Sequence, residues 1–362
     1  MSVLGIGYDY HMNFDIYATS DYFDDLITRI SKTGEGDKVT LATMILFPVD
    51  PMVKRIVEEL AAAAIRGANV TLWFDAHTFL ILRGQRLGPL FFRKNMPGQV
   101  TASFRPAHEA IMHLRRSGVK CLMTNVPGKV LSNPLSGRSH IKFSLINDRV
   151  YIGGCNLDRS TNLDVMVAWD DSSTVEWLEA LVASTELTGQ VKLATGGMDE
   201  QHSLDGGESL LLDAGVAGQS IIFDKALQMI DRSKKYVTLT CQFFPNDLTI
   251  RHLLAAYNRG VKVKIIYNHP SKHLWPQFAL HFAVEKSSKL RLPESFFKGV
   301  VDANRPYLHA KILITEEGVM IGSHNYVRAG VSLGTAEIAL FSHNTALSRQ
   351  VEETILKQTL PR

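Results

Sequence analysis

The sequence of 362 residues predicts an α/β protein built from two copies of one structural unit. Two observations support this prediction. In each half, a β-rich segment, a helical segment and a second β-rich segment follow one another, an order that builds parallel or mixed sheets. In addition, blocks of similar sequence recur in the same order in both halves, as expected after an internal duplication.

The first half contains the clearest strand, helix, strand pattern. Residues 38–47 are rich in β-forming side chains and end at a proline, so we expect a strand there. Pro51 begins a helical stretch that ends at Gly67, and residues 69–75 alternate as a second strand does. Further along we expect helices at 106–116 and 172–188 and strands at 119–125 and 165–169.

The same order restarts in the second half. The expected elements are a helix at 219–233, strands at 236–244 and 261–268 with a helix between them, a strand at 337–341 and a helix from 344. Residues 270–300 lack a regular period and are expected to be irregular. Because residues 191–217 are rich in glycine with few periodic apolar positions, we expect a linker there, between units at 1–190 and 218–362.

The duplication rests on two aligned pairs of blocks. LAAAAIRGANVTLWFD at 60–75 aligns without a gap with LLAAYNRGVKVKIIYN at 253–268. HIKFSLINDRVYIGGCN at 140–156 aligns with HAKILITEEGVMIGSHN at 309–325. The offset is 193 residues for the first pair and 169 for the second, so about 24 extra residues lie between the two blocks of the first half.

Composition excludes several classes of protein. The formal net charge of +3 is far from the single-sign excess of a dedicated nucleic-acid coat protein. Cys121, Cys155 and Cys241 are widely spaced and form no CxxC pair, so we expect neither a disulfide framework nor a zinc site. The N-terminus lacks the pattern of a secretory signal, and no apolar run approaches the ~18 residues of a membrane span. We therefore expect a soluble or peripheral cytoplasmic protein.

The second pair of blocks carries the residues with catalytic chemistry. Each copy has a histidine and a lysine two residues apart, which project from one face if the segment is a strand, and an asparagine in a Gly-rich corner. A pseudo-twofold axis between the halves would bring six side chains to one pocket: His140, Lys142, Asn156, His309, Lys311 and Asn325. Lysines and carboxamides supply positive charge and donors for a tetrahedral oxyanion, while imidazoles titrate near neutral pH.

This set of side chains predicts phosphoryl transfer in which one histidine attacks phosphorus and the other protonates the leaving oxygen. The lysines take the place of a divalent cation, so no metal is required. Each imidazole needs a carboxylate to orient it, and Asp164 and Glu337, shortly after each asparagine, are the candidates. The sequence leaves open the alternative that these two acids lie on an exposed strand or loop.

The pattern HxK, four residues, an acid, and then G-S/G-x-N resembles the phospholipase D superfamily, and the resemblance covers both halves. The second copy follows the pattern with Glu316 at the acid position. In the first copy Asn147 stands at that position, and Gly154 and Cys155 replace the usual serine and the residue after it. These departures predict weaker scaffolding of the first copy, although its histidine, lysine and asparagine are present.

The resemblance implies two α/β/α-sandwich halves packed face to face around one shared active site, so no oligomer is required to complete it. It implies a covalent phosphohistidine on His140, proton donation by His309, resolution by water or an alcohol, and no cofactor. Structures of the family also suggest that the acid of the opposite half orients each histidine, which pairs His140 with Glu337 and His309 with Asp164.

The motif does not name the substrate, because lipid and nucleic-acid members share this chemistry. The basic, apolar segment 79–94 and the aromatic segment 275–297 favour a phospholipid, with peripheral membrane contact through both. Within the lipid class the chain resembles cardiolipin synthases and related phosphatidyltransferases. Such loops also stack bases and follow a phosphate backbone, so a metal-independent nuclease is the alternative. A third possibility is an inactive binding protein, against which the intact His and Lys pairs argue.

Overall fold

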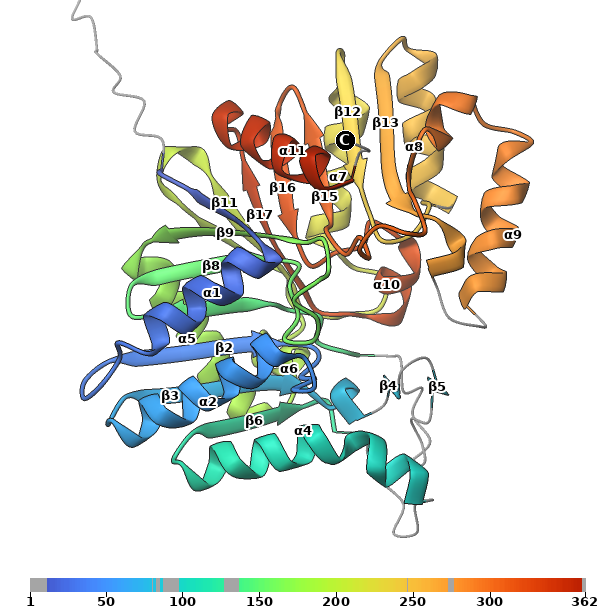
Figure 1. The fold of residues 1–362 in the computed structure, drawn as a ribbon. Coiled ribbons are helices and arrows are strands. Elements are labelled where there is room, and N and C mark those ends of the chain that lie inside the picture. Colours follow the sequence, from blue (N-terminus) through green and yellow to red (C-terminus); the bar gives the residue numbers. More distant parts are fainter. Residues whose placement is uncertain are drawn as a thin grey trace, which may run out of the picture.

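Two mixed β-sheets flanked by helices make up the protein in the computed structural model (Figure 1). The structure describes residues 12–79, 81–82, 85–86, 98–126, 137–245, 247–272 and 277–359.

Elements of the first half begin near residue 15. They are β1 (Asp15–Ala18), α1 (Thr19–Ile30), β2 (Lys38–Thr43), α2 (Pro51–Ile65), β3 (Asn69–Asp75), the 3₁₀ helix η1 (Ala76–Phe79), β4 (Ile81–Leu82), β5 (Gln85–Arg86), α4 (Gly98–Arg116), β6 (Lys120–Thr124), β7 (Phe143–Ile146), β8 (Arg149–Gly153), β9 (Val165–Asp170), α5 (Ser172–Thr188) and α6 (Val191–Ala194).

Elements of the second half continue to residue 359. They are β10 (Glu200–Ser203), η2 (Asp205–Gly207), β11 (Ser209–Asp213), α7 (Ile221–Arg232), β12 (Tyr236–Thr240), α8 (Asp247–Asn258), β13 (Lys262–Asn268), η3 (Pro270–Lys272), α9 (Gln277–Lys289), η4 (Glu294–Phe297), β14 (Gly299–Val301), β15 (Ile312–Thr315), β16 (Gly318–Gly322), α10 (Arg328–Leu333), β17 (Glu337–Ser342) and α11 (Thr345–Thr359).

Strand order confirms the predicted duplication. The first sheet runs β1-β9-β8-β7-β2-β3-β6 and the second runs β10-β11-β17-β16-β15-β12-β13-β14. In both, one parallel pair (β2 with β3, β12 with β13) is followed by three antiparallel pairings. The series β9-β8-β7-β2-β3 therefore corresponds strand by strand to β17-β16-β15-β12-β13.

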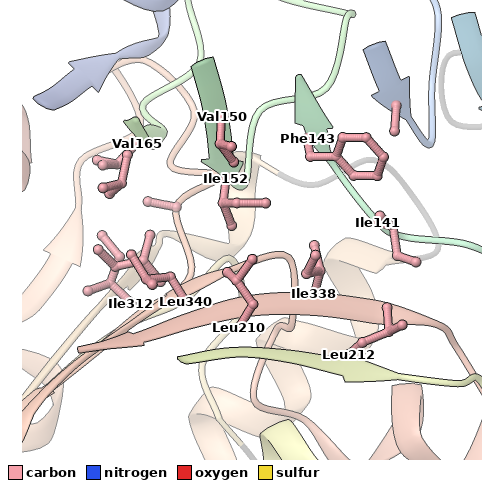
Figure 2. Packing of buried hydrophobic residues seen from close by; sticks show 14 of the residues in the cluster. Ile141, Phe143, Val150, Ile152, Val165, Leu210, Leu212, Ile312, Ile338 and Leu340 are labelled. Carbon is pink, nitrogen blue, oxygen red and sulfur yellow. The ribbon is translucent and has the colours of Figure 1, made fainter. Parts of the chain in front are cut away.

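An apolar layer between the two sheets holds the halves together. Side chains alternate along a strand, so Val150 and Ile152 of β8 join this layer, while Tyr151 between them packs on the opposite face. Figure 2 shows Val150 and Ile152 facing Leu210 and Leu340 of the second sheet. Because one core contains residues of both sheets, the two halves are packed as one body.

The expected linker at 191–217 proves to belong largely to the second sheet. It contains α6, β10 and β11, and β11 pairs with β17 over its whole length, from Ser209 to Asp213. This strand was missed because it is short, buried on both faces and surrounded by glycine, so it shows no alternating pattern.

Other predicted elements also differ from those in the structure. The segment 270–300 was expected to be irregular but contains α9, whose apolar residues are spread around the helix rather than gathered in one stripe. The two HxK triplets were placed on strands, yet β7 and β15 begin one residue after Lys142 and Lys311. The N-terminal β1 and α1 had no sequence prediction.

Gly322, at the end of β16, is closely packed against the adjacent strand. A Cβ atom there would lie 2.2 Å from the carbonyl oxygen of Ile338 on the adjacent strand. We expect Gly322→Ala to lower the free energy of unfolding by roughly 1–3 kcal/mol, because backbone atoms must move to admit the methyl group. Thermal and urea unfolding measure this loss.

Gly330 in α10 provides the matched control, since a Cβ there meets no atom within 4 Å. Gly330→Ala is expected to leave stability unchanged or to raise it by roughly 0.5–1 kcal/mol, because alanine restricts the unfolded chain. Equal stability of Gly322→Ala and the natural protein would contradict the predicted close packing.

Candidate active site

Main-chain bridges between the halves place the two histidines. The amide of His140 donates to the carbonyl oxygen of Ala336 at 2.8 Å, and the amide of Ala336 donates to Arg138 at 2.9 Å. In the same way, the amide of His309 donates to the carbonyl oxygen of Leu163 at 2.8 Å, and the amide of Leu163 donates to the carbonyl oxygen of Tyr307 at 2.8 Å. Each histidine is thereby fixed beside the residue that precedes the predicted orienting acid of the other half.

Both imidazoles are buried and hydrogen-bonded to a carboxylate across the interface between the halves. Nδ1 of His140 lies 2.8 and 3.1 Å from the two carboxylate oxygens of Glu337. Nδ1 of His309 lies 2.6 Å from Oδ2 of Asp164. The crossed pairing expected from the resemblance is the one observed, and neither acid lies on an exposed strand or loop.

These pairs select one tautomer of each imidazole. An ionised carboxylate only accepts hydrogen bonds, so this pairing favours a proton on Nδ1 of each histidine, although Nζ of Lys311 also lies 2.9 Å from Nδ1 of His309. The lone pair of the neutral ring is then on Nε2, the nitrogen left for a substrate. This is the arrangement that a nucleophilic or general-base histidine requires.

Two fully buried lysines lie beside the histidines. Nζ of Lys142 donates to the carbonyl oxygen of His140 at 2.7 Å, and Nζ of Lys311 donates to that of His309. Burial and the charge of Lys311 lower the pKa of Lys142 to about 7. Burial also lowers the pKa of Lys311, against the attraction of Asp164 and Glu337. Two ammonium groups that repel each other favour the binding of an anion between them.

The two carboxylates differ in their electrostatics. Burial would raise the pKa of Asp164, but the charge of Lys311 and the hydrogen bond from His309 hold it below its usual value. Burial raises the pKa of Glu337 because the nearby positive charges only partly compensate. The carboxylate beside His309 is therefore the more firmly ionised.

The two histidines differ accordingly. Burial and the charges of Lys142 and Lys311 hold the pKa of His140 well below its usual value. Burial and Lys311 also lower the pKa of His309, but the hydrogen bond and charge of Asp164 act in the opposite direction. His140 is thus held in its neutral form, while His309 has the partner that favours a proton.

Asn156 and Asn325 occupy corresponding corners after β8 and β16. Asn156 is buried and Asn325 is half-buried, and within the described residues the buried Oδ1 atom of each has no hydrogen-bond partner. A buried amide oxygen without a partner costs roughly 1–3 kcal/mol, and the same unpaired atom occurs at this corner in both halves.

The acid position of the motif lies away from the histidines and supports the sheet. Glu316 accepts hydrogen bonds from the amides of Lys234, Lys235 and Tyr236, where β12 begins. In the first half, Oδ1 of Asn147 accepts from the amide of Lys38, the first residue of β2, at 3.0 Å. Asparagine therefore performs the same task as the acid, and this departure from the motif does not weaken the site.

The glycine at position 154, where the motif usually has a serine, is likewise required by the packing around Asp164. A Cβ at this position would lie 2.3 Å from Oδ1 of Asp164, so a serine does not fit. In the second half, Ser323 donates to the longer side chain of Glu337 and accepts from the amide of Ile338 at 3.0 Å. Asp164 instead accepts from the amide of Val165 at 2.9 Å.

Two positioning residues were missed in the sequence. Oδ2 of Asp75 accepts from the amide of Ser139 at 2.8 Å, and Oδ1 of Asn268 accepts from the amide of Leu308 at 2.9 Å. Each bond fixes the residue immediately before a site histidine. The signal was available, because Asp75 and Asn268 form the last column of the first aligned pair of blocks.

Fold and site together define a phospholipase D-like protein. It has two equivalent halves, each with one HxK motif, and the histidine of each motif is hydrogen-bonded to an acid of the other half. The chain belongs to the family described as "Cardiolipin synthase, PLD-like domain", whose model matches residues 26–185 and 226–358. No curated protein is significantly similar to the chain in sequence.

Solved structures share the fold at low sequence identity. The chain is similar to phosphatidylserine synthase of Haemophilus influenzae Rd KW20, with a TM-score of 0.69, 12% identity, and coverage of 96% of this chain and 86% of that one. It is also similar to polyphosphate kinase of Porphyromonas gingivalis, with a TM-score of 0.56, 14% identity, and coverage of 96% and 51%. These likenesses agree with the duplicated α/β/α architecture.

A metal-binding cluster and a membrane-spanning helix are both absent from the described ranges. No group of three or more His, Cys, Asp or Glu side chains there is arranged to hold a metal ion. No helix in that part of the chain has both the length and the apolar character needed to cross a bilayer.

The lowered pKa of Lys142 predicts that anion binding depends on pH. Sulfate keeps its charge between pH 6 and 9, whereas Lys142 loses its proton as the pH rises through about 7. We therefore expect sulfate affinity to fall above pH 7, by up to about ten-fold for each pH unit. Isothermal titration calorimetry across this range measures the decline.

Lys142→Met is the matched variant, because it removes the charge at similar side-chain length. It should bind sulfate weakly throughout and show less decline with rising pH. Affinity that stays constant from pH 6 to 9 in the natural protein would mean that Lys142 keeps its charge.

Proposed function

We propose that the protein is a phosphatidyltransferase or phospholipase of the cardiolipin synthase-like type, which cleaves a phospholipid phosphodiester through a covalent phosphohistidine. The observation that carries the proposal is the crossed pair of His–carboxylate hydrogen bonds beside two buried lysines. This arrangement provides two imidazoles with fixed tautomers and a positive site for the phosphoryl oxygens.

His140 is the proposed nucleophile. Its pKa is held well below the usual value, so Nε2 has its lone pair at neutral pH. Nε2 forms a bond to phosphorus while the bond from phosphorus to the leaving oxygen breaks. The alkoxide takes a proton from Nε2 of His309, whose protonated form is favoured by ionised Asp164 and by the charge of a bound phosphodiester.

The second step reverses these roles for the acceptor. Nε2 of His309 takes a proton from water or an alcohol as that oxygen attacks phosphorus, and the bond to His140 breaks. Lys142, Lys311, Asn156 and Asn325 are proposed to hold the phosphoryl oxygens in both steps. Water gives a phosphatidic acid, whereas an alcohol gives a new phosphodiester.

Phospholipid is favoured over nucleic acid by the family match and by the modest net charge of +3. Most of the segment 79–94 lies outside the described residues. Phe79 itself is buried against Phe74 and Phe104 and provides no surface for lipid. In the segment 275–297, Phe296 is buried, whereas part of α9 is exposed. We propose a peripheral enzyme acting at a cytoplasmic membrane surface.

Loss of either histidine is expected to abolish turnover. His140→Ala removes the nucleophile, and His309→Ala removes the proton donor, so both should lower kcat by a factor of at least about 10³. Brief reaction with phosphorus-labelled substrate and alkaline quenching should leave acid-labile label on His140. Label on His309 would reverse the two roles, and full activity of either variant would exclude a shared site.

A panel of substrates distinguishes a phospholipid-cleaving enzyme from a nuclease and from an inactive binding protein. We expect turnover of phospholipid in excess EDTA, with a transphosphatidylated product when glycerol or ethanol is present. Lipid analysis by mass spectrometry detects each product, and digestion of single-stranded DNA runs in parallel. Nicked DNA with unchanged lipid would identify a nuclease, while no reaction with either, despite phosphate binding, would identify an inactive binding protein.

A further inference from the structure

Helix α9 is linked to the segment that precedes His309 by a short series of contacts. His281 of α9 stacks on the ring of Phe243, with centroids 4.1 Å apart and an interplanar angle of 10°. The neighbouring Gln242 donates from Nε2 to the hydroxyl of Tyr307 at 2.7 Å, and Tyr307 lies two residues before His309. Figure 1 shows α9 at the outer edge of the second half, beyond α8.

One side of α9 packs on the protein. Val284 contacts the apolar core between α7, α8 and the second sheet, and Glu285 is buried. His281 is enclosed enough that burial lowers its pKa to about 4, which keeps the stacked ring neutral. The helix therefore has a fixed orientation, and its other side is presented outward.

The outward side carries exposed apolar residues. Leu280 and Leu290 are 61% and 85% exposed, and Ala283 is also exposed. Spacings of three and seven residues lie on one face of a helix, so Leu280, Ala283 and Ser287 share a face of α9. Leu290 follows the last residue of α9 directly, and we call these four residues the ridge. Exposed leucines gathered in one patch indicate a surface that is covered during function.

Basic side chains border this ridge. Between residues 277 and 298 four basic residues, Lys286, Lys289, Arg291 and Lys298, outnumber two acidic ones, Glu285 and Glu294. Glu285 is paired with Lys289 at 2.5 Å, while Lys286, Arg291 and Lys298 are exposed. An apolar ridge with a positive border complements the acyl chains and phosphates of an anionic membrane.

We propose that α9 docks the protein on anionic phospholipid surfaces, with Leu280 and Leu290 entering the acyl region and Lys286 and Arg291 contacting lipid phosphates. Docking in this way brings Tyr307, to which α9 is linked through Phe243 and Gln242, toward the membrane, where a phospholipid substrate resides. The inference rests on the proposed function only for the identity of that substrate. Binding of α9 to lipid is a separate property with its own measurement.

Vesicle flotation with two matched pairs of substitutions tests the proposal. Leu280→Ser with Leu290→Ser alters the ridge, and Leu187→Ser with Leu193→Ser is the control at residues that are 87% and 57% exposed on α5 and α6. Vesicles of phosphatidylcholine with about one third phosphatidylglycerol are compared with vesicles of phosphatidylcholine alone.

We expect the natural protein and the control to bind the anionic vesicles and the ridge variant to bind at least ten-fold more weakly. Lys286→Glu with Arg291→Glu should weaken binding similarly, with little effect on the phosphatidylcholine vesicles. Turnover of vesicle lipid should fall with binding, whereas turnover of a monomeric short-chain phospholipid should be retained, since α9 contributes none of the proposed catalytic groups.

Unchanged vesicle binding by the ridge variant would overturn the proposal, as would an equal loss in the control. Equal binding of both vesicle types would remove the role of the basic border. If the ridge variant instead only converts a dimer to a monomer in light scattering, α9 binds a second copy of the chain. Vesicle binding through α9 without lipid turnover would reject the proposed function alone, and lipid turnover without such binding would reject the docking alone.

Discussion

The site depends on two main-chain bridges that join the halves, one between Ser139 and Ala336 and the other between Leu163 and Leu308. Each bridge fixes a histidine and, one residue away, the acid that orients the histidine of the opposite half. Neither half alone therefore contains a complete His–carboxylate pair. The apolar layer between the sheets, with residues from both halves, maintains the alignment of the bridges. The geometry of the site therefore depends on packing in the core between the two sheets.

Burial of two lysines beside two carboxylates determines the electrostatics of the site. Removing such charges from water is expensive, and the structure compensates by placing Asp164 and Glu337 near Lys142 and Lys311. The compensation is incomplete, because the pKa of each lysine is still lowered. A bound phosphodiester brings the missing negative charge and raises the proton affinity of lysines and histidines together. Substrate binding and protonation of the site therefore favour each other.

Much of the fold and site could be predicted because the duplication shows every pattern twice. Residues 69–75 were predicted as a strand with the observed bounds of β3, and the HxK residues meet as expected. β11 was missed because a short strand buried on both faces has no period, and α9 because packing on the core, rather than an apolar stripe, holds it. The aligned blocks place Asp75 and Asn268 at equivalent positions, but the sequence does not show which main-chain amides they hold, because only the fold brings those amides near.

Differences between the two copies reflect adjustment of paired positions rather than decay of one copy. In the first half a glycine at 154 accompanies the shorter acid Asp164, whose carboxylate fills the space that a Cβ would need. In the second half Ser323 accompanies the longer acid Glu337 and hydrogen-bonds to it. The two carboxylates also differ in pKa: burial raises that of Glu337, whereas Lys311 and the hydrogen bond from His309 lower that of Asp164 against the effect of burial. Under the proposed mechanism, this asymmetry would favour His140 as the nucleophile and His309 as the proton donor.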